Sequence, residues 1–295
     1  MKISSFIERG SNQIKYGVVR HGRIFTPVKY FAKKYPTVRD VIEARIIDEL
    51  DNVCKEFESD SYRINDVSLL PPIPNARRVI CVGMNYKKEY PVDAPAPIPD
   101  NIVLFSKLEG TLVGHDRYLE MPPGEAAKTY DYEGEIVCVI GKAGRFIKAE
   151  NALEHIEGFT ILNDGSVRGW QKQSIHAGKN FANSGSCGPW MVTRNEFEDI
   201  NSMHIQTRLN GITVQDATAN EMLFPIHELI AYISNAIDLK PGDLISTGSP
   251  DGSGGSRNPK QFLQVGDQLE IEVSGIGMLR NKVCSLEYPN LINSG

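Results

Sequence analysis

Hydrophobic and polar positions alternate along the start of the chain and then change period. The alternation covers residues 3–28, passes through Gly17 and turns at His21-Gly22, which predicts a β-hairpin or small meander. Thr37 then stands where a helix N-cap is expected, and the following apolar residues recur every three or four positions. They are Val38, Val41, Ile42, Ile46, Leu50, Val53 and Phe57. Together these patterns predict a small N-terminal α/β domain over residues 1–73, ending within the proline-rich stretch LLPPIPNARR.

Beyond this stretch the pattern is that of many short strands separated by glycine and proline turns. After the apolar run at 79–82, the predicted strands are IVLFSKL, YEGEIVCVIG, GFTILND, HIQTRLNG, DLISTG, QLEIEVSGIG and MLRNKV. Residues 137–140 are all apolar, so this strand is expected to be buried on both faces, whereas QLEIEVSG alternates and is expected to be half buried. One helix is predicted over 226–237, before Lys240-Pro241-Gly242. We therefore expect an α+β, β-rich fold with a second domain over residues 74–290.

Composition narrows the possible functions. The 295 residues include 32 basic and 37 acidic side chains, and the net charge of −5 leaves no basic surplus for binding nucleic acid. The five cysteines form no CxxC pair, which disfavours both a disulfide framework and a structural zinc site. The N-terminus lacks a signal-peptide core, and no apolar run is long enough to span a membrane. We expect a cytoplasmic protein that binds neither nucleic acid nor membrane.

Two glutamates stand at the start of one of the most apolar predicted strands. In DYEGEIVCVIGK, Glu133 and Glu135 are two positions apart, so both side chains point to the same side of the strand. The strand GFTILND ends in Asp164, beside a glycine turn. Three converging carboxylates would form a hard oxygen site suited to Mg²⁺, Mn²⁺ or Ca²⁺. The alternative interpretation is a solvated strand end.

Three polar residues downstream of Asp164 are candidates for binding an anion. Arg168 and Gln171 follow the acid by four and seven positions, on one face if the segment is helical, and Lys179 lies further on. Their donors suit a small anionic substrate, and the alternative is an exposed basic turn. The chain has no GxGxxG after a strand, no GxxxxGK[ST], no GxSxG and no HExxH, which disfavours the corresponding nucleotide, hydrolase and zinc sites.

Six stretches of the chain resemble the fumarylacetoacetate hydrolase superfamily, in its large bacterial group. They are PPIPNARRVICVGMNY, DYEGEIVCVIGKAG, TILNDGSVRGWQ, GKNFANSGSCGPWMVT, TGSPDGSGG and LQVGDQLEIEVSGIGMLRN, in the family's order over residues 70–285. The resemblance implies a catalytic domain of mixed β-sandwich or β-roll type after the small N-terminal domain, and a homodimer.

The resemblance also implies a site. Glu133, Glu135 and Asp164 match positions that hold a divalent metal, Mg²⁺ or Mn²⁺, which would stabilise the enolate of a 2-oxo acid substrate. Lys179 would add a donor to the same negative charge. The positions that match the substrate shell are Arg168, Gln171, Ser249, where the family often has threonine, and Tyr86 of GMNY.

The chain departs from the family's hydrolases directly after GMNY. Those hydrolases carry a lid histidine there, which activates the attacking water together with a glutamate, whereas this chain reads GMNYKKEYP. Glu89 is a candidate base, because lid closure would desolvate its carboxylate, and the alternative is a surface charge. His176, just before GKNF, is a second candidate. We expect the lid over 86–99, with its loop PVDAPAPIP, to become ordered on substrate binding.

Three functions remain open at this point. The first is a metal-dependent hydrolase that cleaves a C–C bond of an acylpyruvate-like 2,4-dioxo acid to pyruvate and a carboxylic acid. Fumarylpyruvate, maleylpyruvate and the ring-fission products of aromatic catabolism are substrates of this type. The alternative is an isomerase, tautomerase or decarboxylase on a 2-oxo acid, such as oxaloacetate or 2-hydroxyhepta-2,4-diene-1,7-dioate, because the lid histidine is missing. The third, a non-catalytic protein that binds a small anion, is disfavoured by the intact carboxylate trio.

Overall fold

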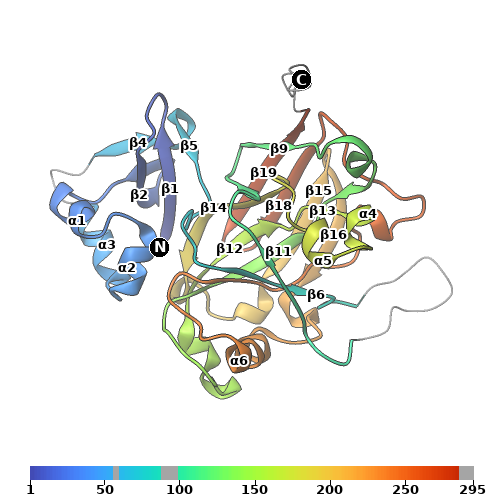
Figure 1. Ribbon diagram of the computed structural model, residues 1–295. Coiled ribbons are helices and arrows are strands. Elements are labelled where there is room, and N and C mark those ends of the chain that lie inside the picture. The colour runs from blue at the N-terminus through green and yellow to red at the C-terminus, as the bar shows by residue number, and fades with distance from the viewer. Residues whose placement is uncertain (56–59, 88–98, 286–295) are drawn as a thin grey trace, which may run out of the picture.

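The structure, a computed structural model, describes residues 1–55, 60–87 and 99–285 and is built mainly from strands (Figure 1). A large mixed sheet and a smaller second sheet pack against each other, with short helices packed around them. This confirms the predicted α+β, strand-rich fold class. Within the described ranges, no helix is both long and apolar enough to cross a membrane.

The N-terminal part is the predicted antiparallel meander. It consists of β1 (Lys2–Glu8), β2 (Ile14–Arg20) and β3 (Arg23–Phe25), extended by β4 (Ser61–Arg63), while β5 (Val67–Leu69) pairs with β1. His21 and Gly22 form the turn between β2 and β3 with φ angles of 47° and 72°. A two-residue turn with both φ angles positive matches the twist of the two strands that it joins.

The helix predicted after Thr37 is interrupted, so that expectation was wrong in one respect. The structure has α2 (Val38–Glu43) and α3 (Ile47–Val53), preceded by a short α1 (Lys29–Lys34). Thr37 caps α2 as predicted, in a capping box with Asp40. Arg45 adopts a φ of 57°, which ends α2, and the Ile46 N–H then donates to the carbonyl of Val41. Phe57 lies outside the described residues.

The large sheet runs through both halves of the chain. Its order is β4-β3-β2-β1-β14-β12-β11-β17-β6-β7, and β8 (Leu112–Val113) pairs with β14. The later strands are β6 (Val79–Gly83), β7 (Val103–Lys107), β11 (Gly134–Ile140), β12 (Ile156–Asn163), β14 (Gly185–Thr193) and β17 (Leu244–Ser246). Because β1 pairs directly with β14, the N-terminal meander continues the same sheet. The division at residue 73 stays a prediction.

The smaller sheet contains three predicted strands and two that were not predicted, at 118–120 and 212–218. The sheet has the order β16 (Ile212–Thr218), β15 (His204–Leu209), β18 (Gln268–Val273), β19 (Gly277–Cys284) and β9 (Tyr118–Glu120). The helix predicted over 226–237 is α6 (Ile226–Ala236). Two short strands, β10 (Tyr130–Asp131) and β13 (Ser166–Val167), pair beside α4 (Arg168–Gln171) and α5 (Ile175–Gly178).

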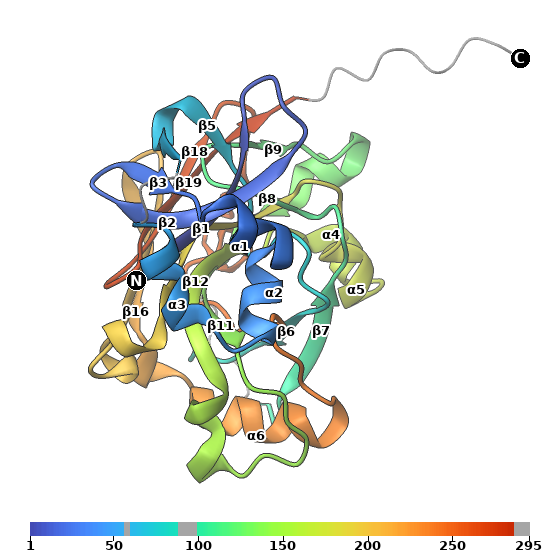
Figure 2. The same ribbon diagram turned by 90° about the vertical axis from the view of Figure 1, so that its left-hand side faces the viewer.

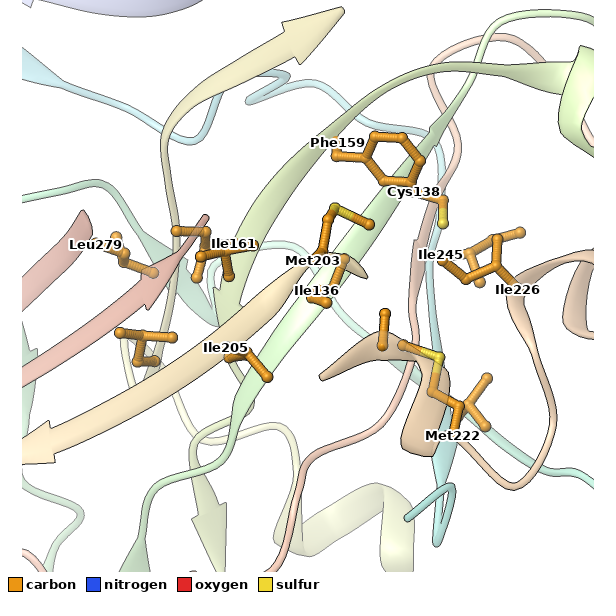
Figure 3. Close-up of a cluster of buried hydrophobic side chains, with 14 of the residues drawn as sticks. Ile136, Cys138, Phe159, Ile161, Met203, Ile205, Met222, Ile226, Ile245 and Leu279 are labelled. Carbon is orange, nitrogen blue, oxygen red and sulfur yellow. The ribbon is translucent and has the colours of Figure 1, made fainter. Parts of the chain in front are cut away.

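Strand β11 is buried on both faces, as its uninterrupted apolar run predicts. On one face Ile136 and Cys138 lie in a cluster with residues of β12, β15, β19 and α6 (Figure 3). On the other face Val137 and Val139 pack in a cluster with residues of α2 and α3, which lie in front of β11 and β12 in Figure 2. Successive side chains therefore enter opposite layers. The expected half-burial of β18 is also confirmed, because Leu269, Ile271 and Val273 are buried.

Gly134, at the start of β11, lies directly against side chains of the smaller sheet. A Cβ atom there would lie 2.2 Å from Thr207 Oγ1 and 3.0 Å from Ile271 Cγ2. We expect Gly134→Ala to destabilise the protein by about 1–3 kcal/mol through overpacking. This exceeds the gain of ~0.4–1 kcal/mol from a stiffer unfolded chain.

Urea unfolding of the variant measures this difference. Gly83→Ala is the matched control, because its Cβ would meet Val103 Cγ1 at 3.5 Å, an ordinary contact. Equal stability of the two variants would contradict the close packing at Gly134.

Candidate active site

Three strand ends meet at one edge of the large sheet. Strands β11 and β12 are antiparallel, with Gly134 opposite Asn163, so the start of β11 lies beside the end of β12. The Asp164 N–H donates to the Glu133 carbonyl at 2.8 Å and continues this pairing beyond the strands. Strand β17 ends at the same edge, because its Ser246 is opposite Val137 of β11. The backbone therefore brings acids that are distant in sequence to one place.

The structure brings the three predicted carboxylates together. One oxygen from each of Glu133, Glu135 and Asp164 lies within 4.8 Å of the others. Their exposed fractions are 6%, 1% and 0%, so the alternative of a solvated strand end does not hold. Buried acids at this spacing repel one another and need nearby positive charge.

Two lysines supply positive charge to these acids. The Lys179 ammonium, at the C-terminal end of α5, contacts Glu133 Oε2 and lies 2.6 Å from Asp164 Oδ2. Lys107, at the end of β7, lies with its Nζ 2.7 Å from Asp164 Oδ1, and this contact is an ion pair without a hydrogen bond. Its ammonium donates instead to the carbonyls of Gly165 and Lys179, at 3.0 and 2.6 Å. Both lysine side chains are buried.

Burial and neighbouring charges shift the ionisation of this cluster in both directions. Loss of solvent, followed by the charges of Asp164 and Glu133, raises the pKa of Glu135 to about 8. Burial opposes the charged form of Lys179, but Asp164 and Glu133 outweigh it and raise the pKa of the lysine above its ordinary value. The neighbouring acids therefore favour the charged form of Lys179, whose ammonium donates to both of them.

The acidic cluster fits a divalent cation. All hydrogen bonds to Glu135 that the structure describes go to Oε2, from Ser246 Oγ and from the Gly248 N–H at 3.1 Å. Asp164 Oδ1 is buried and accepts no hydrogen bond from the described residues. The site thus combines three clustered carboxylates with a carboxylate oxygen that these hydrogen bonds leave unused. Hard cations such as Mg²⁺ and Mn²⁺ prefer this donor set.

Arg168 and Gln171 lie beside the acids, although the segment after Asp164 is helical only in part. Residues 166–167 form strand β13, because Ser166 pairs with Asp131, and α4 begins only at Arg168. The Arg168 side chain is 21% exposed and donates to Glu133 Oε1 at 2.8 Å and to Gln171 Oε1 at 3.1 Å. The alternative of an exposed basic turn therefore does not describe Arg168.

The remaining predicted residues are placed less completely. Tyr86 is 4% exposed, and its hydroxyl has no hydrogen-bond partner among the described residues. Ser249 is 5% exposed and follows Gly248, whose N–H reaches Glu135. His176 is exposed on α5. Glu89 and most of the expected lid, residues 88–98, lie outside the described residues, so these predictions stay open.

Sequence reasoning missed two buried charged residues of the site, Lys107 and Asp131. Asp131 is fully buried and pairs with Arg168 through Nε at 2.7 Å. The spacing Asp131, Glu133, Glu135 repeats every second position and was a visible signal for a third acid on the same side. Lys107 had no such signal, because its partners Gly165 and Lys179 lie 58 and 72 residues away in sequence.

Comparison with known proteins places this geometry in a family. Residues 78–284 match the fumarylacetoacetate (FAA) hydrolase C-terminal domain, a range that contains the acids, the lysines and Arg168. The chain belongs to the fumarylacetoacetate hydrolase family. The resemblance seen in the sequence is thereby confirmed.

Three members of this family illustrate the similarity in sequence and in structure. It is 37% identical to the mitochondrial oxaloacetate tautomerase FAHD2A of Bos taurus over 74% of this chain and 70% of the relative. It is 35% identical to the oxaloacetate tautomerase YisK of Bacillus subtilis over 77% of each chain. A fumarylacetoacetate hydrolase structure from Exiguobacterium antarcticum superposes with a TM-score of 0.80 at 30% identity, covering 97% of this chain and 100% of the other.

The acidic cluster makes a direct prediction about metal binding. We expect Glu135→Gln to weaken Mn²⁺ binding at least about 100-fold, because a neutral amide replaces one of three anionic oxygens. The amide oxygen can still accept the hydrogen bonds from Ser246 and Gly248, so the melting temperature should change little. Calorimetric titration with Mn²⁺ and a thermal melt measure both quantities.

A partly buried glutamate outside the acidic cluster serves as the control. Glu157 on β12 is partly buried, and burial raises its pKa, but it is not part of the acidic cluster. Glu157→Gln should bind Mn²⁺ like the parent protein. Unchanged Mn²⁺ affinity in Glu135→Gln would remove this residue from the metal site.

Proposed function

We propose that the protein is a divalent-metal-dependent tautomerase that interconverts the enol and keto forms of a small 2-oxo acid, with oxaloacetate as the favoured substrate. The observation that carries this proposal is the similarity to oxaloacetate tautomerases, at 35–37% identity over about three quarters of the chain. The acids, lysines and arginine described above all fall within the matched family range. Our first expectation was C–C hydrolysis, and the missing lid histidine suggested an isomerase or tautomerase as the alternative. The similarity supports this alternative better than hydrolysis.

The metal in this proposal is Mg²⁺ or Mn²⁺, held by Glu133, Glu135 and Asp164. When bound, it would supply a Lewis acid that stabilises negative charge on the C2 oxygen of the substrate. The same three carboxylates repel an anionic substrate, so other residues of the chain must attract the substrate carboxylates.

The cationic side chains around the acids are suited to that task. Arg168 has five N–H donors and uses three in contacts with Asp131, Glu133 and Gln171. The other two, one on each terminal nitrogen, are proposed to bind a substrate carboxylate, as a planar guanidinium does well. Lys179 is proposed to donate to the C2 oxygen as negative charge develops there. Its raised pKa keeps the ammonium charged at neutral pH.

Tyr86 is proposed to add a neutral donor on the substrate side. Burial, followed by the charges of Glu135 and Glu221, raises the pKa of its phenol above the ordinary value. The hydroxyl therefore stays protonated at neutral pH. Because it has no hydrogen-bond partner among the described residues, a substrate oxygen would satisfy an otherwise unpaired buried group.

Tautomerisation moves a proton within the substrate and adds no water, which agrees with the residues present at the site. One proton leaves the C2 hydroxyl of the enol and one is gained at C3, so the product has the same mass as the substrate. No water is added across a bond. The reaction therefore does not require the water-activating histidine that GMNYKKEYP lacks.

The decisive experiment follows oxaloacetate itself. With Mg²⁺ or Mn²⁺, the protein should accelerate the decay of the enol absorbance, and a chelator should abolish that acceleration. Pyruvate is measured in parallel with oxaloacetate and with acylpyruvates. Metal-dependent release of pyruvate without enol–keto conversion would instead establish decarboxylation or C–C hydrolysis and reject the proposal.

Lys179 provides a test of the mechanism. We expect Lys179→Met to lower the tautomerisation rate on the order of 10²- to 10³-fold, because one charged donor to the developing oxyanion is lost. The exposed Lys172, at the end of α4, gives the matched control, and Lys172→Met should keep the parent rate. A Lys179→Met enzyme with unchanged kcat would exclude the lysine from the reaction.

A further inference from the structure

Asp131 is a fourth buried carboxylate at the site, and its partners differ from those of the three clustered acids. It lies two residues before Glu133 in the DYEGE stretch and is fully buried. Its Oδ1 accepts from the Tyr132 and Gly254 N–H groups at 2.9 and 2.7 Å. Its Oδ2 accepts from the Gly255 N–H at 2.9 Å and from Arg168 Nε at 2.7 Å. Four donors occupy its two oxygens, and Asp131 is not one of the three clustered acids.

The contact with Asp131 fixes the orientation of the Arg168 guanidinium. The group is planar, so anchoring Nε on Asp131 and one terminal nitrogen on Glu133 defines the directions of all its N–H bonds. Gln171 supports the second terminal nitrogen at 3.1 Å. Burial opposes the charged form of Arg168, but Glu133 and Asp131 outweigh it and keep the pKa of the guanidinium raised.

Asp131 also fastens the loop that contains Ser249. A Cβ atom on Gly254 would lie 2.8 Å from Asp131 Oδ1 and 1.9 Å from the Gln261 carbonyl. On Gly255 it would lie 3.2 Å from Asp131 Oδ2 and 3.3 Å from Arg168 Nε. The glycines thus let the loop backbone reach the carboxylate. Asp131 thus joins its own segment to Arg168 and to this loop through side-chain hydrogen bonds.

We propose that Asp131 is a positioning residue, which acts through Arg168 to set the affinity for the substrate carboxylate. It orients the two remaining guanidinium N–H groups toward the anion and contributes neither a metal ligand nor a proton. The inference rests on the proposed function in one respect, that Arg168 binds the substrate anion. It assigns the D-x-E-x-E acids two tasks, with Glu133 and Glu135 for the cation and Asp131 for the anion.

The test is a double-mutant cycle on the Mn²⁺-loaded protein, with oxalate as a non-reacting 2-oxo acid mimic. Asp131→Asn should weaken oxalate binding about tenfold to 100-fold, because a neutral amide no longer holds the guanidinium. Arg168→Gln should weaken it at least as much. Adding Asp131→Asn to Arg168→Gln should then change the affinity by less than about twofold, because the residue through which Asp131 acts is gone.

Kinetics and metal binding separate this role from a general structural one. With oxaloacetate, Asp131→Asn should raise KM by a similar factor, keep kcat within about threefold and leave Mn²⁺ affinity unchanged. Gly255→Ala, whose Cβ presses on both partners, should raise KM less and in the same direction, and it provides a second route if Asp131→Asn fails to fold.

A buried aspartate elsewhere gives the control. Asp243 is fully buried, pairs with Arg78 through both oxygens and accepts the Lys240 N–H at 2.8 Å. Asp243→Asn should lower the melting temperature without changing oxalate affinity. The inference is overturned if the Asp131 and Arg168 effects multiply in full, if kcat falls at constant KM, or if the parent protein binds no oxalate. Coupled oxalate binding without oxaloacetate turnover would reject only the proposed function.

Discussion

Everything at the site depends on the cost of burying charge. Glu133, Glu135, Asp164 and Asp131 lie out of water at one sheet edge, and an unpaired carboxylate there would be strongly unfavourable. The cations that offset this cost are Lys107 of β7, Lys179 of α5 and Arg168 of α4. Each of these cations comes from a different part of the chain. Ion pairs as well as packing therefore hold these elements in place around the acids. The ion pairs that offset the buried charge therefore also hold together the elements that form the site.

The hydrophobic layers make this arrangement precise. Alternate residues of β11 enter two separate apolar clusters, so the strand has no free face along which to shift. Glu135 projects from that strand, and the packing on both faces of the strand fixes its position. Asp164 directly follows β12, and β12 pairs with β11 along its length. Placing carboxylates on such strands gives a geometry that flexible loops do not provide.

The sequence predicted the features that depend on local pattern. Short apolar runs between glycine and proline turns identified β7, β11 and β12, and alternation identified β18. The strand period of two placed Glu133 and Glu135 on one side. Capping by Thr37 was visible for the same reason. The interruption of the helix at Arg45 was not visible in the sequence. A positive φ angle is usually signalled by a glycine, and here the residue is an arginine. Lys107 was missed because its role exists only after β7 has joined the sheet beside β6, far from its partners in sequence.

The enclosure of β11 has an evolutionary consequence. A substitution along this strand is felt in two layers at once, whereas α4 has only four residues and the loop after Ser249 is fastened through backbone amides and one carboxylate. Change is therefore tolerated unequally across the site. A lineage that acquires a new substrate can change the exposed residues of the helical turn and the loop, while the acid-bearing strands and the glycines that contact Asp131 stay fixed, so that one carboxylate cluster serves different substrates. The same division identifies where directed evolution of this scaffold should introduce diversity.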